Sequence, residues 1–218
     1  MALLKSKIGE IPEDAIILSE TDALKHQMNI IKKWDKSSEV FALRYGPYIL
    51  GAGALLCGAF FNNYFRRKFL LGHYGVLASY FPVCFVPGAA STILHSEVVL
   101  RKIVLMKFDE CPICMEMRAV AVQASLGVLY PMVVAPIGCA ALAVRFSTHD
   151  IPYVTERPKE VLNTFRKMFK QIHTKTLYMF IAQAFLASVV TYYEASNLIN
   201  ISKTISEQEE NNQNHLMR

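Results

Sequence analysis

Two cysteines three positions apart are the residues of this 218-residue sequence best suited to react. Cys111 and Cys114 enclose a proline and an isoleucine. Such a pair can close a disulfide, lower the pKa of one thiol, or supply half of a tetrahedral zinc site. We expect the neighbouring carboxylates of Asp109 and Glu110 to raise the pKa of the thiols. A structural disulfide in an oxidising compartment and a pair of inert thiols are the favoured interpretations, and redox or metal chemistry is the third.

The remaining residues do not form a catalytic set. A zinc site needs two further ligands, and the sequence has no second cysteine pair or His-x-His cluster. Cys57, Cys84 and Cys139 lie in apolar runs, where a thiol behaves as a small apolar group. The sequence also lacks a phosphate-binding loop and a Ser-His-Asp combination. We therefore expect a protein that is not an enzyme and holds no cofactor or metal.

The composition is typical of a membrane protein. Hydrophobic residues make up 53% of the chain and charged residues 19%, whereas an ordinary soluble domain has about 25% charged residues. The 23 Lys and Arg residues exceed the 18 Asp and Glu residues, but this charge lies mainly between apolar blocks. Charge in that position indicates membrane topology, and it argues against nucleic-acid binding.

Four runs without Asp, Glu, Lys or Arg are long enough to cross a bilayer as helices. Charged residues bound each run, and aromatic residues lie near the ends, as at membrane interfaces. Helices of a soluble bundle would carry a polar stripe at helical spacing, which these runs lack. We predict an all-α, polytopic membrane protein with a transmembrane domain over 46–193. Its four predicted helices span residues 46–65, 74–94, 119–144 and 176–193.

Prolines predict bends in two of these helices. Pro82 and Pro87 lie in the second run, and Pro131 and Pro136 lie in the third. Each removes a backbone donor and clashes with the preceding turn. The short apolar stretch 98–106 is broken by two basic residues, so we expect it to be a connector.

Two further segments predict amphipathic surface helices. The N-terminal extramembrane segment, 1–45, contains a candidate helix at 21–36 with Ser19 as its N-cap. Its apolar face is made by Leu24, Met28 and Ile31. The second candidate, 158–173, is either a platform for lipid or a partner, or a solvated approach to the last span. Its apolar side is made by Val161, Phe165, Met168 and Ile172, and its basic residues are Arg166, Lys167 and Lys170. The polar tail, 194–218, is predicted to be disordered.

Four crossings would place both termini and the 95–118 loop on one side of the membrane. The connections 66–72 and 145–175 would lie on the other side, and they are rich in Lys and Arg with few acids. The positive-inside rule assigns that second side to the matrix or cytosol. Further basic residues near the start of the first run oppose this assignment, so the orientation of the termini stays open.

Small residues recur at four-residue spacing in three of the runs, as in membrane helices that pack closely. These faces serve contacts within the protein, contacts with another membrane protein, or both. The deeper polar residues, Gln123 and Gln183, are expected to join helices by hydrogen bonds. The small residues are Gly53, Ala54, Cys57, Gly58, Ala135, Cys139, Ala143, Ala184 and Ser188.

Several short motifs occur in a fixed order relative to the four runs. They are Phe65-Arg66-Arg67, the Cys111 and Cys114 pair, Arg118, Gly127-Val-Leu-Tyr130-Pro131, Arg145-Phe146, and Phe165-Arg166-Lys167-Met168. In this order and placement they resemble the transmembrane protein 126 family of mitochondrial inner-membrane proteins. The resemblance covers residues 40–195, roughly, and leaves both ends of the chain unmatched.

The resemblance implies a multi-pass protein of the mitochondrial inner membrane that assists assembly of the membrane arm of respiratory complex I without being an enzyme. Its partners would be complex I membrane-arm subunits, other complex I assembly factors and membrane lipid, and not nucleic acid. The family provides no catalytic or ligand-binding residues to carry over. The first 14 residues lack the apolar core of a secretory signal and contain three acids, so we expect internal targeting information. A small transporter or channel and a permanent accessory subunit of a respiratory complex remain as alternatives.

Overall fold

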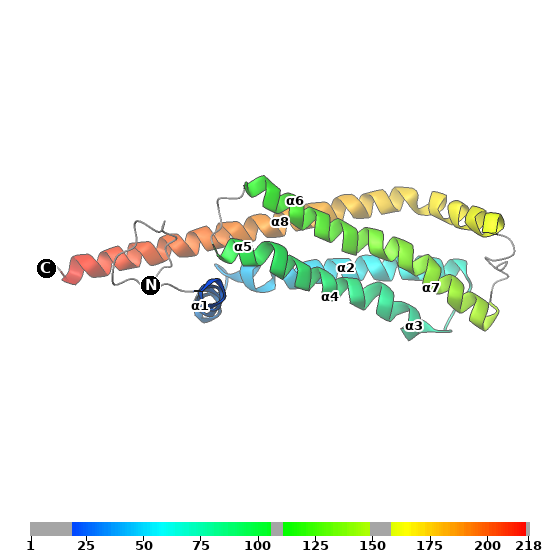
Figure 1. Ribbon diagram of the computed structural model, residues 1–218, viewed down its shortest axis with the longest axis horizontal. Coiled ribbons are helices and arrows are strands. Elements are labelled where there is room, and N and C mark those ends of the chain that lie inside the picture. Colours follow the sequence, from blue (N-terminus) through cyan, green and yellow to red (C-terminus); the bar gives the residue numbers. More distant parts are fainter. Residues whose placement is uncertain (1–18, 106–110, 149–157, 217–218) are drawn as a thin grey trace.

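The computed structural model describes residues 19–105, 111–148 and 158–216, and every regular element in these ranges is helical. Four long helical rods run along the molecule. They are α2 (Phe41–Lys68), α3 to α5 (Val76–Val104), α6 to α7 (Pro112–Phe146) and α8 (Pro158–Leu216). Figure 1 shows the rods side by side, with α1 across one end. This arrangement confirms the predicted all-α fold. Three elements of the described ranges are continuous α-helices without a π-helical turn: α1 (Glu20–Lys33), α2 (Phe41–Lys68) and α8 (Pro158–Leu216).

The two middle rods pass through π-helical turns. The first contains α3 (Val76–Tyr80), η1 (Phe81–Phe85), α4 (Val86–His95), η2 (Ser96–Leu100) and α5 (Arg101–Val104). The second contains α6 (Pro112–Ala124), η3 (Ser125–Leu129) and α7 (Tyr130–Phe146). Pro87 and Pro131 follow η1 and η3 by two residues, so the carbonyl that each proline cannot bond lies within the π-helical turn. The irregularity predicted from these prolines thus takes the form of widened turns.

Three helical stretches in the described ranges are long and apolar enough to cross a membrane. The last three predicted spans fall mainly within them. The first predicted span, 46–65, falls in α2 (Phe41–Lys68), which is not among the three. α2 contacts α4, α7 and α8 along the bundle. The three stretches are Val76–Val104, Ile113–Phe146 and Phe165–Gln208.

The stretch 98–106 is not a connector as far as the structure describes it. It is helical to Val104, and the side chains of Val99 and Ile103 are fully buried. Arg101 lies on the other side, with its Nη1 atom 3.4 Å from Oε2 of Glu97. The two basic residues therefore mark the polar face of a continuing amphipathic helix.

The prediction of a disordered tail over 194–218 is wrong for residues 194–216. These residues continue α8 to Leu216. Leu198 and Ile201 are buried in an apolar cluster that also contains Ile31, Leu50 and Ile103, called the first apolar cluster, and Ile205 packs against it. The buried face of α8 therefore extends beyond the apolar run. A helix that is already nucleated and packed can continue through a polar sequence at little further cost.

The amphipathic character of α1 is confirmed, and its apolar face packs on the protein. Ser19 caps the helix, since its Oγ atom accepts a hydrogen bond from the backbone N–H of Asp22 at 3.2 Å. Ile31 is buried in the first apolar cluster, with Leu24 and Met28 packed around it. Arg44 of α2 donates to the carbonyl oxygens of Ile31 and Lys32 at 2.7 and 2.8 Å. These contacts fasten the C-terminal end of α1 to α2.

Of the apolar side predicted for 158–173, Phe165, Met168 and Ile172 pack inside the bundle, and the side chain of Val161 lies outside the described residues. Ile172 is fully buried in a second apolar cluster, which also contains Phe61, Phe65 and Phe69. The rings of Phe65 and Phe169 lie 5.7 Å apart, and those of Phe69 and Phe165 lie 6.2 Å apart, both at steep angles. These aromatic contacts join the ends of α2 and α8.

A matched pair of glycine substitutions tests how closely the helices approach. A Cβ atom at Gly58 would collide with the Val83 carbonyl oxygen and lie 3.0 Å from the Cα atom of Cys84, whereas one at Gly138 would meet nothing within 4 Å. We expect Gly58→Ala to lower the free energy of unfolding by about 1–3 kcal/mol. Gly138→Ala should be neutral or raise it by up to about 1 kcal/mol. Thermal unfolding in detergent micelles checks both, and equal effects would contradict the close contact.

Candidate functional site

A layer of hydrogen-bonded polar side chains joins four rods in the interior of the bundle. Gln123 of α6 donates through Nε2 to the Leu50 carbonyl oxygen at 2.9 Å and to Oε1 of Gln183 at 2.6 Å. Its own oxygen accepts a hydrogen bond from the Ser91 hydroxyl at 2.6 Å. Gln183 of α8 donates in turn to the Gly53 carbonyl oxygen at 2.9 Å. Both glutamines therefore join helices as predicted, and Gln123 uses both amide donors and its acceptor.

A buried acid–base pair joins α4 to α8. The Nε2 atom of His95 lies 2.9 and 3.2 Å from the two carboxylate oxygens of Glu194, and the side chains are 1% and 0% exposed. A Cβ atom at Gly46 of α2 would collide with this carboxylate, so the pair is enclosed on that side as well. The Nδ1 atom of His95 and the Oγ1 atom of Thr191 are buried without a hydrogen-bond partner. An ionisable pair is thus buried at the level where the second and fourth predicted spans end.

This pair was missed because each residue adjoins an apolar run in the sequence. His95 directly follows the second predicted span and Glu194 the fourth. Even-numbered spans of a four-pass protein end on the same side, so the two residues fall at one level. When an acid and a base each directly follow one of two such spans, the sequence indicates that they can meet as a buried pair.

Arg66 has a structural role that sequence analysis also missed. Its side chain is buried at the end of α2. The guanidinium donates to the carbonyl oxygens of Gly72 and Tyr74 at 2.7 and 2.9 Å, and to the Ser79 hydroxyl at 2.8 Å. These bonds hold the connection from α2 to α3. One residue of the Phe65-Arg66-Arg67 motif thus fixes a turn, in addition to adding positive charge.

The small residues at four-residue spacing serve contacts within the bundle. Gly53 and Ala184 are half-buried, as is Ser188, and Gly53 faces Gln183 and Leu186 of α8. Of the two uses considered for these faces, the structure assigns the buried residues to internal packing. The buried ones are Ala54, Cys57, Gly58, Ala135, Cys139 and Ala143.

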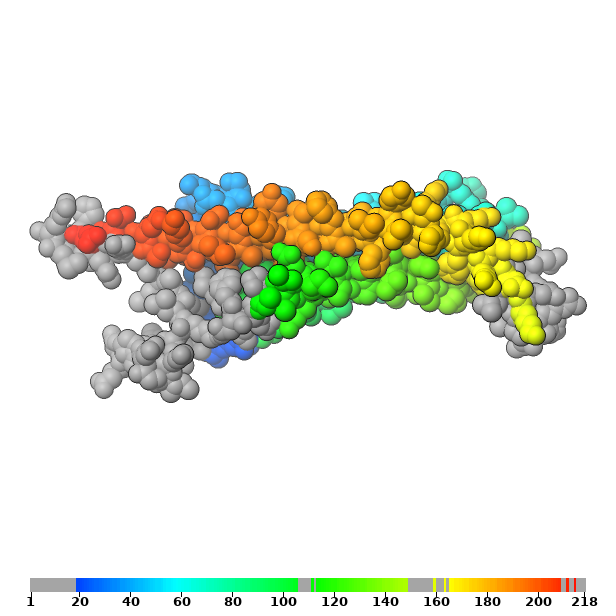
Figure 2. All heavy atoms as spheres, turned by 90° about the horizontal axis from the view of Figure 1, so that it is seen from above, coloured from blue at the N-terminus to red at the C-terminus, as the bar shows by residue number. Residues whose placement is uncertain are grey.

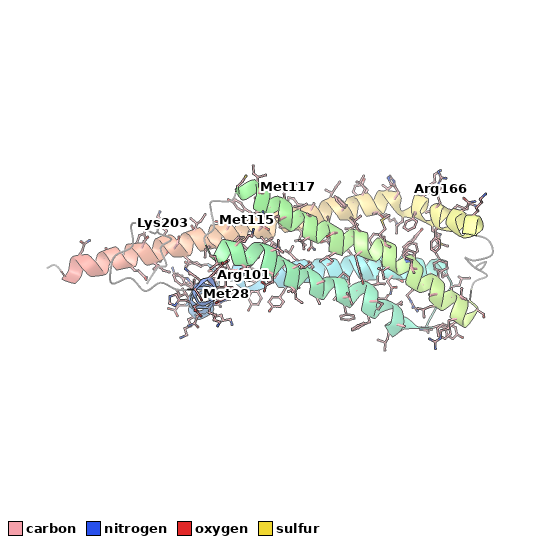
Figure 3. The ribbon with its side chains drawn as sticks, viewed as in Figure 1. Met28, Arg101, Met115, Met117, Arg166 and Lys203 are labelled. Carbon is pink, nitrogen blue, oxygen red and sulfur yellow. The ribbon has the colours of Figure 1, made fainter. Side chains whose placement is uncertain are left out.

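The basic residues predicted on the surface are exposed. Arg166, Lys167 and Lys170 lie on the first turns of α8, on the side away from the buried Ile172. Figure 3 shows Arg166 near one end of α8 and Lys203 toward the other. This basic group lies at the end of the bundle that also carries the basic end of α2.

The Cys111 and Cys114 pair lies where α6 begins, with both side chains exposed and not joined in a disulfide. The backbone N–H of Cys114, the Cys114 thiol and the backbone N–H of Ile113 act together to lower the pKa of Cys111. The described groups therefore shift the pKa of this thiol in the direction opposite to the predicted rise, because the helix N-terminus favours the thiolate. Asp109 and Glu110, on which that prediction rested, lie outside the described residues.

The described residues contain no group of three or more His, Cys, Asp or Glu side chains that could hold a metal ion. One surface hollow is lined by residues of α1, and another by residues at the C-terminal end of α2 and the turn after it. Neither is lined by the glutamine layer or the His95–Glu194 pair. The interior polar groups bond to one another across the helix contacts. This arrangement can hold the four long helical rods at fixed positions relative to one another.

Substitutions at His95 and Glu194 test whether the pair acts as one unit. We expect His95→Leu or Glu194→Leu alone to lower the free energy of unfolding by about 3–5 kcal/mol, since each leaves the other polar group buried without its partner. The double replacement should recover most of that loss, and Glu194→Gln should cost less because its amide oxygen still accepts from His95. Thermal unfolding of the purified variants in detergent measures these differences. Additive single effects would show that the two residues act independently.

The family assignment rests on similarity over most of the chain. Residues 23–209 match the family model described as transmembrane protein 126. A relative, Transmembrane protein 126 of Drosophila melanogaster, is 43% identical over 172 residues, which cover 79% of this chain and 77% of the relative. No solved structure matches the chain. The chain belongs to the transmembrane protein 126 family.

Proposed function

We propose that the protein is a non-enzymatic scaffold of the mitochondrial inner membrane that assists assembly of the membrane arm of respiratory complex I (NADH:ubiquinone oxidoreductase). The observation that carries the proposal is the division of the bundle into a bonded polar interior and an apolar exterior. The glutamine layer joins α2, α4, α6 and α8 by internal hydrogen bonds. The side chains left for contact with lipid or a membrane partner are large and apolar.

The outer face of α8 is the surface we propose for contact with a membrane-arm subunit. α8 contains the least buried of the three candidate spans, and Figure 2 shows it along the outside of the bundle beside α6 and α7. Phe185 and Tyr178 on this face are 70% and 69% exposed. Ile181 and Tyr192 are exposed at compatible helical spacing. Aromatic side chains of this kind provide large contact areas for a neighbouring helix.

Affinity purification of the tagged full chain from gently solubilised mitochondria tests the proposal. Native-gel separation and mass spectrometry of each co-migrating band should find partial complex I modules together with assembly factors. The finished enzyme should lack the protein, because a scaffold leaves when its client is complete. Recovery only in finished complex I would make the protein an accessory subunit, and recovery alone would favour the transporter alternative.

A pair of variants tests the contact face. We expect Phe185→Ala combined with Tyr178→Ala to lower the recovery of partial complex I modules several-fold, since truncating a buried aromatic side chain at an interface costs about 1–3 kcal/mol. The matched control is Val133→Ala combined with Ile137→Ala on α7, whose side chains are also exposed. Equal recovery with both double variants would contradict the assignment to α8. Unchanged thermal unfolding would show that the bundle is intact.

A further inference from the structure

We propose that Cys111 and Cys114 form an exchange-active dithiol that reacts with disulfides in the aqueous phase. Cys111 is the attacking thiol, and Cys114 is the resolving thiol. This inference concerns the start of α6 and does not depend on the proposed role in complex I assembly.

The backbone places Cys111 at the N-cap of α6. Its carbonyl oxygen accepts hydrogen bonds from the backbone N–H groups of Cys114 at 2.9 Å and Met115 at 3.3 Å, while its own φ and ψ of −53° and 127° are not helical. A side chain at the N-cap faces the unpaired N–H groups of the first turn. Pro112 has no N–H, and the first-turn N–H groups of Cys114 and Ile113 lower the pKa of the Cys111 thiol without forming a side-chain cap hydrogen bond.

The second thiol lies within reach of the first. The Cys114 side chain donates a hydrogen bond to the sulfur of Cys111. Side chains three residues apart on a helix have Cβ atoms about 5–6 Å apart, and a disulfide needs about 3.5–4.5 Å. Because Cys111 lies just outside the helix, a small backbone adjustment closes that difference without unwinding α6.

Accessibility separates this pair from the other cysteines. Cys111 and Cys114 are exposed, whereas Cys57, Cys84 and Cys139 are buried between helices. The next residue, Met115, is buried in the first apolar cluster and anchors the first turn of α6. Figure 3 shows Met115 on the α8 side of this helix and Met117 projecting away from it. The thiols thus lie on an anchored helix end that a reagent in water can approach.

The exchange needs a disulfide as co-reactant, either glutathione disulfide or a disulfide of a protein. The Cys111 thiolate attacks one sulfur of that disulfide, forms a mixed disulfide and releases one thiolate. The Cys114 thiol loses its proton to water, and its thiolate then attacks the Cys111 sulfur. The internal disulfide forms and the second thiolate leaves. The pair has lost two electrons and two protons, and the co-reactant has been reduced to two thiols.

The purified full chain in detergent is the material for the test. It is incubated with glutathione and glutathione disulfide at graded ratios, quenched with acid, alkylated and digested with trypsin. Cleavage after Lys107 and Arg118 gives one peptide that contains both cysteines of the pair and no others. Mass spectrometry of this peptide distinguishes the dithiol, the internal disulfide and the glutathione adduct. A disulfide-linked model peptide replaces glutathione disulfide in a parallel arm.

We expect the wild-type chain to form the internal disulfide while the three buried cysteines stay reduced. Cys114→Ser should accumulate the mixed disulfide at Cys111, at least about tenfold faster than Cys111→Ser accumulates one at Cys114. The rate for Cys111 should also persist to lower pH, because a thiol with a lowered pKa keeps its thiolate as the pH falls. Reaction in only one arm identifies a small-molecule or a peptide disulfide as the co-reactant.

Three results would overturn the inference. A pair that stays reduced at every ratio in both arms is not exchange-active. Equal rates in the two single variants would remove the assignment of Cys111 as the attacking thiol. A stable adduct on the wild-type chain, without an internal disulfide, would remove the resolving role of Cys114. Thermal unfolding of both variants shows whether the fold is retained, and both positions are exposed enough for serine to be accommodated.

Discussion

The bundle depends on hydrogen bonds that satisfy polar side chains away from water. Gln123 and Gln183 bond to each other and to carbonyl oxygens of α2, so each glutamine fixes the relation of its helix to its neighbours. An unsatisfied amide in an apolar interior costs several kcal/mol, which makes alternative registers of the helices unfavourable. The apolar clusters on either side of this layer supply packing, but packing between apolar helices allows sliding. The polar layer selects one arrangement.

Proline, the π-helical turn and glycine act together where α2 meets the second rod. Pro87 cannot bond the Val83 carbonyl, and the turn that contains Val83 is widened. That carbonyl oxygen faces Gly58 of α2 so closely that the space has no room for a Cβ atom. A backbone irregularity caused by one residue is therefore accommodated by the absence of a side chain on another. Small residues in membrane helices permit such contacts.

The sequence predicts the helical class, the Ser19 cap and the apolar side of 158–173 because these depend on residues close together in the chain. It predicts the bonding of Gln123 and Gln183 from their depth in apolar runs. The burial of His95, Glu194 and Arg66 depends on partners that only the fold brings together. In the sequence alone, each residue therefore looks like the polar end of a predicted span. The full length of α8 could not be predicted from the sequence either, because it also depends on contacts made by the fold. Its polar C-terminal part has low hydropathy, and helix continuation there follows from packing of Leu198 and Ile201.

The division between interior and exterior limits how this protein can hold a membrane partner. Lipid chains are as apolar as the exposed side chains of α8, so burial of those side chains against another helix gains no hydrophobic free energy. Attraction must come from packing, and the glutamine layer is already bonded within the bundle. Contacts of this kind are individually weak and reversible, which fits the proposed scaffold role better than that of a permanent subunit. The exposed thiols of Cys111 and Cys114 differ from this surface, because covalent exchange can hold or release a group independently of packing.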